Sequence, residues 1–368
     1  MSSAYTLYAA PLSLYSGKVR GFLRWKNVAF KEVLATREVY ASEILPRVGW
    51  PVIPVLVAPD HSTVQDTTDI IDYVEMHEPG PSIYPDGPQQ KLAALILELF
   101  GDEYLLIAAM YYRWTFNEEF AYGEFGNALY AELPAEERAA KGREDGARFK
   151  AFLPLLGITP KTAPAIEASY EEFLKAFDAH LAEHDFLFGS RPSIGDYGLL
   201  GPLYAHNYRD PASGDHMEKT APRVANWCRY THAPQHFGTG EFLQGDEIPE
   251  TLMPILKMFA REQLPVLLST LEQMKAWHAA NPDADEVPRA IGMHEYTIGG
   301  TTDNRGVIPY SLWMLQRVTD HLNNLAGDDK TSANKLLSSI GAGALIDLDI
   351  SPRLTRKNFK LHIAQTDT

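Results

Sequence analysis

Short apolar runs alternate with helical spacing over the first 86 residues of the chain. Residues 5–10 form a β-type run that ends at Pro11, and residues 30–34 form a second. Between them, Val19, Phe22 and Leu23 recur at intervals of three and four, which predicts a helix from about residue 16. A strand, a helix and a second strand in this order predict a parallel pair of strands.

A third apolar run, at residues 55–58, starts directly after Pro54 and leads through a turn to Asp66 and Thr67. A proline next to an apolar run is tolerated at the start of a strand, and a cis bond is one way to fit it into a tight turn. A helix is predicted over residues 67–76, with Ile70, Ile71 and Val74 facing inward. The N–H groups at a helix start suit a bound carboxylate, so this stretch predicts a place for a small peptide-like anion.

Helical periodicity dominates from residue 89 onward. One apolar stripe contains Leu92, Leu95, Ile96, Leu99, Leu106, Ile107 and Met110. Glu103 lies on this stripe, so we expect it to be half-exposed at an interface or paired. The polar stretch 131–148 is either a solvated helix or a loop excursion. Another helix is predicted over residues 163–184, with an inward face of Ile166, Tyr170, Phe173, Leu174 and Phe177.

A capping pair marks the next helix, because Ser193 precedes Asp196 by three positions. A buried face of Leu199, Leu200 and Leu203 follows it. Residues 234–249 are rich in Gly and Pro and predict a linker. Beyond the linker we expect helices at about 250–278 and 309–326, with a hairpin or loop at 295–302 between them.

Composition narrows the class of protein. A chain of 368 residues predicts two or three domains, and its net charge of −15 argues against nucleic acid or an anionic membrane as partner. A single cysteine, Cys228, excludes an internal disulfide framework and a Cys-based zinc site, and we expect it to be a core residue. The N-terminus lacks a signal-peptide pattern and no stretch is long enough to span a bilayer, so a cytoplasmic location is expected.

Four of these features, in this order and spacing, resemble a cytosolic glutathione transferase over roughly the first 235 residues. They are the run from Ser13 to Arg20, which resembles the serine-type, zeta- or theta-like classes, the Ile53-Pro54 pair, the Asp66-Thr67 pair, and the Ser193–Asp196 capping box. The resemblance implies a thioredoxin-like α/β glutathione-binding domain at residues 1–86 and an all-helical domain at 87–238. Residues 239–368 would be a helical extension without a role assigned by the family, and the assembly would be a homodimer.

The resemblance also assigns roles near the start of the first helix. Ser13 matches the hydroxyl that activates glutathione in the serine-type classes. Tyr15 stands where the zeta-like pattern has a cysteine, and Ser16 stands where it has its second serine. Ser13, Tyr15 and Ser16 are the candidate catalytic residues, and the sequence leaves open which of them activates the thiol. Ser13 either activates the thiol or only caps the helix, with Ser16 as the competing cap.

The glutathione backbone and its acidic end would be held by the two later pairs. Ile53, next to Pro54, would hydrogen-bond the cysteinyl backbone of glutathione. Asp66 would meet the γ-glutamyl ammonium and Thr67 its carboxylate, where the family more often has Glu-Ser. The alternative, which we favour less, is that Asp66 is only a negative charge that stabilises a helix start.

The implied chemistry depends on forming a thiolate. A free thiol has a pKa near ~8.5, so little of it is ionised at neutral pH. A hydroxyl that donates to sulfur at a helix N-terminus favours the thiolate, which then attacks a hydrophobic electrophile. Glutathione would be a co-substrate and no metal is expected.

Departures from the family pattern leave other functions open. Val52 stands where the family commonly has a basic or amide residue, so one anchor for the glycyl end is absent. A non-catalytic binding or scaffold protein is therefore an alternative. A glutathione-dependent isomerase or ether-cleaving enzyme is a further one, although Tyr15 in place of cysteine weakens it.

Two further motifs have a structural and a functional interpretation. Aromatic residues around Tyr111 and Trp114 either pack in a core or line the pocket for the hydrophobic substrate. His180 and His184 flank Glu183 in a zinc-protease-like spacing, but without a third ligand we favour a solvated helix face over a metal site.

Overall fold

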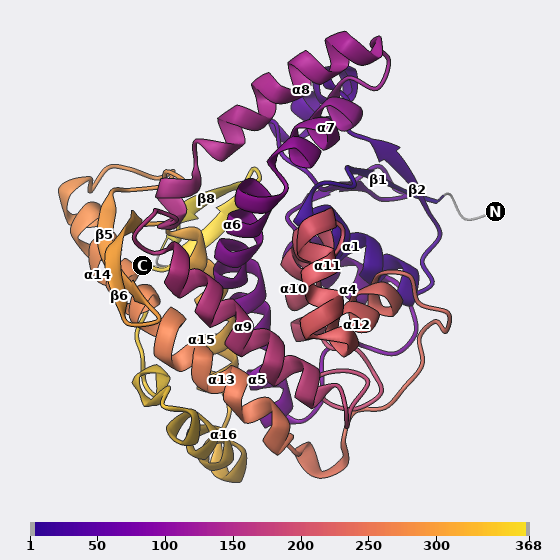
Figure 1. The fold of residues 1–368 in the computed structure, drawn as a ribbon. Coiled ribbons are helices and arrows are strands. Elements are labelled where there is room, and N and C mark those ends of the chain that lie inside the picture. The colour runs from indigo at the N-terminus through magenta and orange to yellow at the C-terminus, as the bar shows by residue number, and fades with distance from the viewer. Residues whose placement is uncertain (1–3, 366–368) are drawn as a thin grey trace. The chain divides into compact units, whose positions relative to one another are not determined.

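The computed structural model describes residues 4–365, which form two compact units (Figure 1). Unit 1 comprises Met1–Ser82, Ala109–Phe152 and Tyr197–Gly240. Unit 2 comprises Ile83–Ala108, Leu153–Asp196 and Glu241–Thr368. Helices from the middle of the chain contribute to both units, while the three-part division at residues 86 and 238 stays a prediction drawn from family resemblance.

Unit 1 is built around a four-stranded sheet in the order β2-β1-β3-β4. The strands are β1 (Tyr5–Ala9), β2 (Phe30–Leu34), β3 (Val55–Val57) and β4 (Thr63–Gln65). β1 and β2 are parallel, as the strand-helix-strand pattern predicted, whereas β3 runs antiparallel to both β1 and β4. The sheet is therefore mixed, and β4 is a strand that the sequence pattern missed.

Two helices of unit 1, α1 (Leu14–Trp25) and α4 (Thr67–His77), lie next to each other beside this sheet (Figure 1). Their predicted inward residues have no exposed surface: Val19, Phe22, Leu23, Ile70, Ile71 and Val74. The α/β thioredoxin-like arrangement predicted for the N-terminal part is confirmed.

The other helices of unit 1 come from two later segments of the chain. They are α7 (Glu118–Leu129), α8 (Ala135–Lys150), α11 (Pro211–Thr220) and α12 (Pro222–His232). The first segment adds two short helices, α2 (Arg37–Val39) and α3 (Leu45–Val48). Helices α6 (Leu106–Phe116) and α10 (Ile194–Pro202) run across the boundary between the units. The polar stretch 131–148 is thus largely helical, as one of its two interpretations predicted.

Helices α7 and α8 pack closely enough to form a hairpin (Figure 1). Glycines make the approach possible: a Cβ on Gly142 would lie 2.5 Å from the backbone nitrogen of Gly126 and from the backbone oxygen of Tyr122. The two backbones meet with no room for a side chain between them.

Unit 2 is mainly helical. Its helices are α5 (Pro88–Phe100), α9 (Ala163–His180), α13 (Met253–Met258), α14 (Leu264–Ala280), α15 (Tyr310–Asn324) and α16 (Gly327–Ile340), with π-helical turns at Gly101–Leu105 and Phe259–Gln263. Two β-hairpins complete it: β5 (Met293–Ile298) with β6 (Thr301–Gly306), and β7 (Leu354–Lys357) with β8 (Lys360–Ile363). The extension is therefore helical with two small sheets, and the hairpin expected near residues 295–302 is present.

Helix α5 lies in the core of unit 2, where α15 and α16 pack against it. Leu92, Ile96 and Leu99 are fully buried, so the predicted apolar stripe is covered by later helices of the same chain. Glu103 is half-buried and lines a cavity within this unit.

The capping pair forms as predicted. Ser193 donates from its backbone N–H and its hydroxyl to Asp196 Oδ2, both at 2.8 Å, and Asp196 Oδ1 accepts from the Leu187 N–H at 3.1 Å. Three donors that would otherwise be buried without an acceptor are thereby satisfied.

Cys228 and His180, the other residues that the sequence analysis singled out, are both buried. Cys228 is fully buried, and burial raises the pKa of its thiol. His180 places Nδ1 2.9 Å from the Thr251 hydroxyl and Nε2 3.2 Å from the Phe186 carbonyl, so both ring nitrogens face protein groups. No group of three or more His, Cys, Asp or Glu residues placed to hold a metal occurs within residues 4–365.

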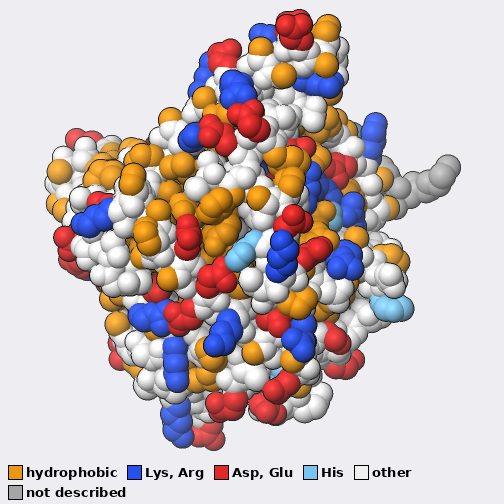
Figure 2. Space-filling view, in the orientation of Figure 1, with side chains coloured by type: hydrophobic (Ala, Val, Ile, Leu, Met, Phe, Trp, Pro, Cys, Tyr) orange, Lys and Arg blue, Asp and Glu red, His pale blue; other side chains and the backbone are white. Residues whose placement is uncertain are grey.

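Two further properties concern the ability of the helices to span a membrane and the distribution of charge on the surface. No helix in the described part of the chain has the length and apolarity needed to cross a membrane. On the face drawn in Figure 2, Lys and Arg side chains are interspersed with Asp and Glu side chains. The negative net charge is thus mixed with positive groups over that face.

Candidate functional site

Strand register brings three predicted site segments to one end of the sheet in unit 1. Tyr8 of β1 pairs with Val55 of β3, and Val55 also pairs with Gln65 of β4. Because β3 is antiparallel to both neighbours, the start of β3 lies beside the ends of β1 and β4. Ser13, the Ile53-Pro54 pair and Asp66 follow or precede these strand ends directly along the chain.

Ser13 is the N-cap of α1. Its hydroxyl oxygen accepts a hydrogen bond from the Ser16 N–H at 3.2 Å, and its side chain is half-buried. The cap uses a lone pair of the oxygen and leaves the O–H available to donate. Ser16 is fully buried, and its oxygen accepts from the Ala10 N–H at 3.3 Å. Capping and thiol activation by Ser13 are therefore compatible, whereas Ser16 holds the loop from inside.

The bond between Ile53 and Pro54 is cis, as the sequence pattern suggested. Pro54 is buried and Ile53 is half-buried, so the backbone of Ile53 borders the surface at the start of β3. Val52 beside it is also half-buried and brings no charge.

Asp66 has an unusual backbone for a residue other than glycine, with φ of 92° and ψ of 141°. Its carboxylate caps α4 by accepting from the Thr68 N–H at 2.9 Å, and Thr67 begins the helix. A positive φ costs about 1–3 kcal/mol and tends to persist at functional sites, where the surrounding structure enforces it.

Lys18 is a feature of this region that the sequence analysis missed. Its side chain has no exposed surface, and Nζ lies 3.5 Å from the Thr68 hydroxyl. A buried ammonium thus links α1 to the first turn of α4, next to Asp66. The sequence around Lys18 gave no sign that this side chain is buried, because α4, the helix that it contacts, lies far away in the sequence.

Two sequence families match the chain in this order. The glutathione S-transferase N-terminal domain matches residues 7–82, and the glutathione S-transferase C-terminal domain matches residues 160–229. The chain is therefore similar to glutathione S-transferases over these two stretches. The first match contains every position predicted to contact glutathione or its thiol, and the second contains the capping box.

Solved structures with a similar fold include a glutathione S-transferase from Rhodospirillum rubrum F11, with 16% identity, 67% of this chain and 96% of that chain covered, and a TM-score of 0.42. A Tau class glutathione S-transferase from mango, Mangifera indica, has 18% identity over 69% of this chain and 96% of that chain, with a TM-score of 0.42. A glutathione S-transferase from Methylobacterium radiotolerans, solved with glutathione sulfonate, has 18% identity over 66% and 99%, with a TM-score of 0.40. Comparison with curated proteins gives no match.

The loop before Ser13 is held by side chains from later segments of unit 1. Arg113 donates to the Leu12 carbonyl at 2.9 Å, and His206 Nε2 lies 3.2 Å from the same oxygen. Arg209 donates to the Pro11 carbonyl at 2.7 Å. Burial lowers the pKa of His206 well below its usual value, so the ring is neutral and donates one hydrogen bond.

Arg113 is anchored by a buried ion pair. Its guanidinium donates to both oxygens of Asp210 at 2.6 and 2.7 Å, and to the Ala205 carbonyl at 3.1 Å. Arg113 is 2% exposed and Asp210 is fully buried, so the loop is tied to a pair that water does not screen. The only sign in the sequence that Arg113 could anchor this loop was its position between Tyr112 and Trp114, within a run of aromatic residues.

The aromatic residues predicted to line a substrate pocket are both buried. Tyr111 packs edge-on against Tyr112 and Phe116, while Trp114 packs against Tyr122 and Phe125 of α7. Their packing within α6 and α7 is established by these contacts. A contact with substrate stays a prediction for both.

A second cationic cluster lies between α1 and α12. Arg20 forms a two-pronged ion pair with Glu32, and the ring of His232 stacks on Tyr204 at 3.6 Å. Arg20 and Arg24 lie 3.4 and 3.3 Å from the two ring nitrogens of His232. Burial, followed by the charges of these arginines, lowers the pKa of His232 to about 2, so the ring is neutral.

Proposed function

We propose that the chain is a glutathione transferase that conjugates the glutathione thiolate to a hydrophobic electrophile. The observation that carries this proposal is the strand register, which gathers the start of α1, the cis-proline and the start of α4 at one end of the sheet. The matches to both glutathione S-transferase domain families support glutathione as the co-substrate.

Each predicted residue has one task in this proposal. The Ser13 hydroxyl donates to the glutathione sulfur while its oxygen stays bonded to the Ser16 N–H. The backbone of Ile53, which is half-buried next to the cis bond to Pro54, pairs with the cysteinyl residue. Tyr15, which is half-buried in the first turn of α1, borders the thiol without replacing Ser13 as its hydrogen-bond donor.

The γ-glutamyl end would lie against the start of α4. Asp66 attracts its ammonium, and Thr67 with the first turn of the helix attracts its carboxylate. The buried Lys18 adds a positive charge close to that turn and favours a bound carboxylate. The strained backbone of Asp66 supports a binding role over a cap alone.

A binding or scaffold protein without turnover is the second candidate. Val52 favours it, because no charged side chain at that position meets the glycyl end of glutathione. An isomerase or ether-cleaving enzyme has weaker support, since Tyr15 occupies the position of the family cysteine.

Assembly and location extend the proposal. A homodimer is expected by family, and light scattering that gives the mass of one chain would reject it. Glu103 lines a cavity of unit 2 and is half-exposed, so its part in a contact between chains stays a prediction. A cytoplasmic location fits the enzyme, because the glutathione pool there is reducing.

The experiment is conjugation of glutathione to a chloronitrobenzene by wild type, Ser13→Ala and Ser16→Ala. Removing one hydrogen bond to a developing anion costs about 10²–10³ in turnover, which is the loss expected for Ser13→Ala. Glutathione binding without turnover by wild type would select the scaffold function. Unchanged turnover in Ser13→Ala would reject the assigned activator.

A further inference from the structure

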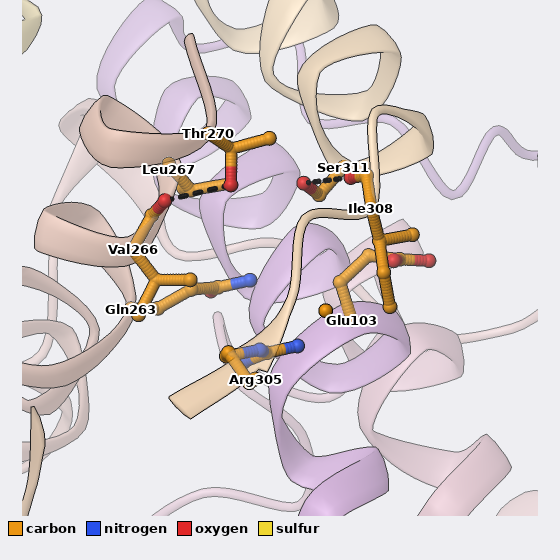
Figure 3. A pocket seen from close by; sticks show the side chains of 9 residues that line it. Glu103, Gln263, Val266, Leu267, Thr270, Arg305, Ile308 and Ser311 are labelled. Atoms are coloured by element: carbon orange, nitrogen blue, oxygen red, sulfur yellow. Dashed lines mark hydrogen bonds between the residues drawn. The ribbon is translucent and has the colours of Figure 1, made fainter. Parts of the chain in front are cut away.

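Unit 2 contains a small cavity (Figure 3). None of its lining residues belongs to the proposed glutathione site. The cavity has a volume of about 10 Å³ and is bordered by the π-helical turn at Gly101–Leu105, by α14, by the end of β6 and by the start of α15. Its polar lining residues are Glu103, Gln263, Thr270, Arg305 and Ser311. A volume of this size holds one water molecule or one small ion.

Arg305 is the unusual member of this lining. Its side chain comes from β6 and is only 5% exposed. Among the described residues, the Nε of its guanidinium is enclosed without a hydrogen-bond acceptor. Its one aromatic contact is with the face of Tyr296, at 5.6 Å.

The other polar side chains of the cavity are directed elsewhere. Thr270 donates to the Val266 carbonyl at 2.8 Å, and Ser311 donates to the Ile308 carbonyl at 2.9 Å (Figure 3). Gln263 donates from Nε2 to the Leu99 carbonyl at 3.1 Å. None of these bonds satisfies the arginine.

The positive charge of Arg305 raises the free-energy cost of leaving its enclosed Nε–H without an acceptor. A guanidinium carries five N–H donors and stays protonated in proteins. Burial lowers the pKa of Arg305, and Tyr104, Tyr296 and Glu103 oppose that shift. The cross-strand neighbour His294 brings no compensating charge, since burial and Arg305 lower its pKa to about 4.

Within residues 4–365, the Arg305 guanidinium lacks an acceptor for its Nε–H, and its buried positive charge lacks a counter-charge. A group bound inside the cavity would supply what is missing. A water molecule supplies a lone pair but leaves the desolvated charge uncompensated, whereas an anion supplies both. The small volume and the apolar side chains of Val266, Leu267 and Ile308 in the lining exclude sulfate or phosphate. A monovalent ion of halide size meets both conditions.

We propose that Arg305 binds a small monovalent anion of halide size in this cavity. The ion accepts hydrogen bonds from the guanidinium, and it links β6 to the start of α15 and to α14. Glu103 limits its affinity by repulsion from the far side. This site is independent of glutathione and of any transferase activity.

Bromide is the probe, and thermal unfolding of the full chain is the first measurement. Sodium bromide is compared with sodium gluconate at equal ionic strength for wild type, Arg305→Gln and Arg353→Gln. Arg353 is the matched control, because it is an exposed arginine of the same unit that pairs with Asp320. A hundredfold excess over Kd is expected to raise the Tm of wild type and Arg353→Gln by about 3 °C, with no specific rise in Arg305→Gln.

Glu103→Gln separates an anion from a water. Removing the repulsion is expected to lower the bromide concentration that gives half of the Tm rise by about tenfold, whereas a bound water predicts no bromide dependence in any variant. Equal Tm values in bromide and gluconate for wild type would overturn the proposal.

Crystallography of wild type decides the matter if Arg305→Gln does not fold. Crystals soaked in bromide are expected to give an anomalous peak within about 3.5 Å of the Arg305 guanidinium, a distance typical of a hydrogen bond to a large anion. A cavity that contains only water in those crystals would refute the assignment.

Discussion

The guanidinium of Arg113 donates a hydrogen bond to the backbone carbonyl of Leu12, the residue that precedes Ser13, at 2.9 Å. The same guanidinium forms a buried ion pair with Asp210. A helix more than a hundred residues later in the chain therefore fixes the loop on which the proposed thiol activator lies.

Removing the partner of a buried charge is expected to destabilise unit 1 strongly. Arg113→Met leaves Asp210 buried without its cation and the Leu12 carbonyl without a donor, so the free energy of unfolding should fall by about 3–5 kcal/mol. Urea denaturation measures the change. Arg353→Met, which breaks an exposed pair with Asp320, should change it by less than ~1 kcal/mol, and equal losses in both variants would argue against the clamp.

The α7–α8 hairpin should not tolerate a methyl group at its glycine contact. Gly142→Ala places a Cβ 2.5 Å from the backbone of Gly126, so the helices must move apart and the Tm should fall. Gly123→Ala in the same hairpin meets no atom within 4 Å and should raise stability by about 0.5–1 kcal/mol. Thermal unfolding compares the two, and a similar effect of both alanines would contradict the close backbone contact.

Acid should weaken the protein through His232. The pKa of this histidine is lowered from 6.5 to about 2 in the folded chain, so the unfolded chain binds a proton first as pH falls. Stability is fully present above pH 6.5 and is lost below it, by about 1.4 kcal/mol per pH unit for this one proton. His232→Gln should flatten the pH dependence of unfolding between pH 6.5 and 4.5, and an unchanged slope would show that the ring does not titrate this way.

Asp66 should matter for binding more than for stability. Asp66→Asn keeps the size of the side chain but removes the charge that attracts the γ-glutamyl ammonium, so glutathione should bind about 10- to 100-fold more weakly. Isothermal titration calorimetry measures it. Asp72→Asn is the control, because it removes a carboxylate later in the same helix and should leave the affinity unchanged.

Local signals in the sequence were sufficient for much of the thioredoxin-like part. The spacing of Val19, Phe22 and Leu23 predicted α1, and Pro54 before an apolar run predicted the cis bond. Three-residue β4 was missed because Thr63–Gln65 is too short to show alternation. The β7–β8 hairpin was missed because Asn358 and Phe359 take positive φ values without a glycine.

The buried cationic side chains were harder to predict. Arg113, Lys18 and Arg305 are ordinary surface residue types, and their burial depends on partners far away in sequence. Ser13 and Asp66 could be found because a cap acts within four residues of itself. Chemistry set by local backbone geometry was predictable, whereas chemistry set by tertiary packing was not.

A crystal structure with reduced glutathione tests the central claim most directly. We expect the tripeptide along the backbone of Ile53, with its γ-glutamyl end at Asp66 and Thr67 and its sulfur within hydrogen-bond distance of the Ser13 hydroxyl. Saturating glutathione that leaves only water at this end of the sheet would contradict the proposed function.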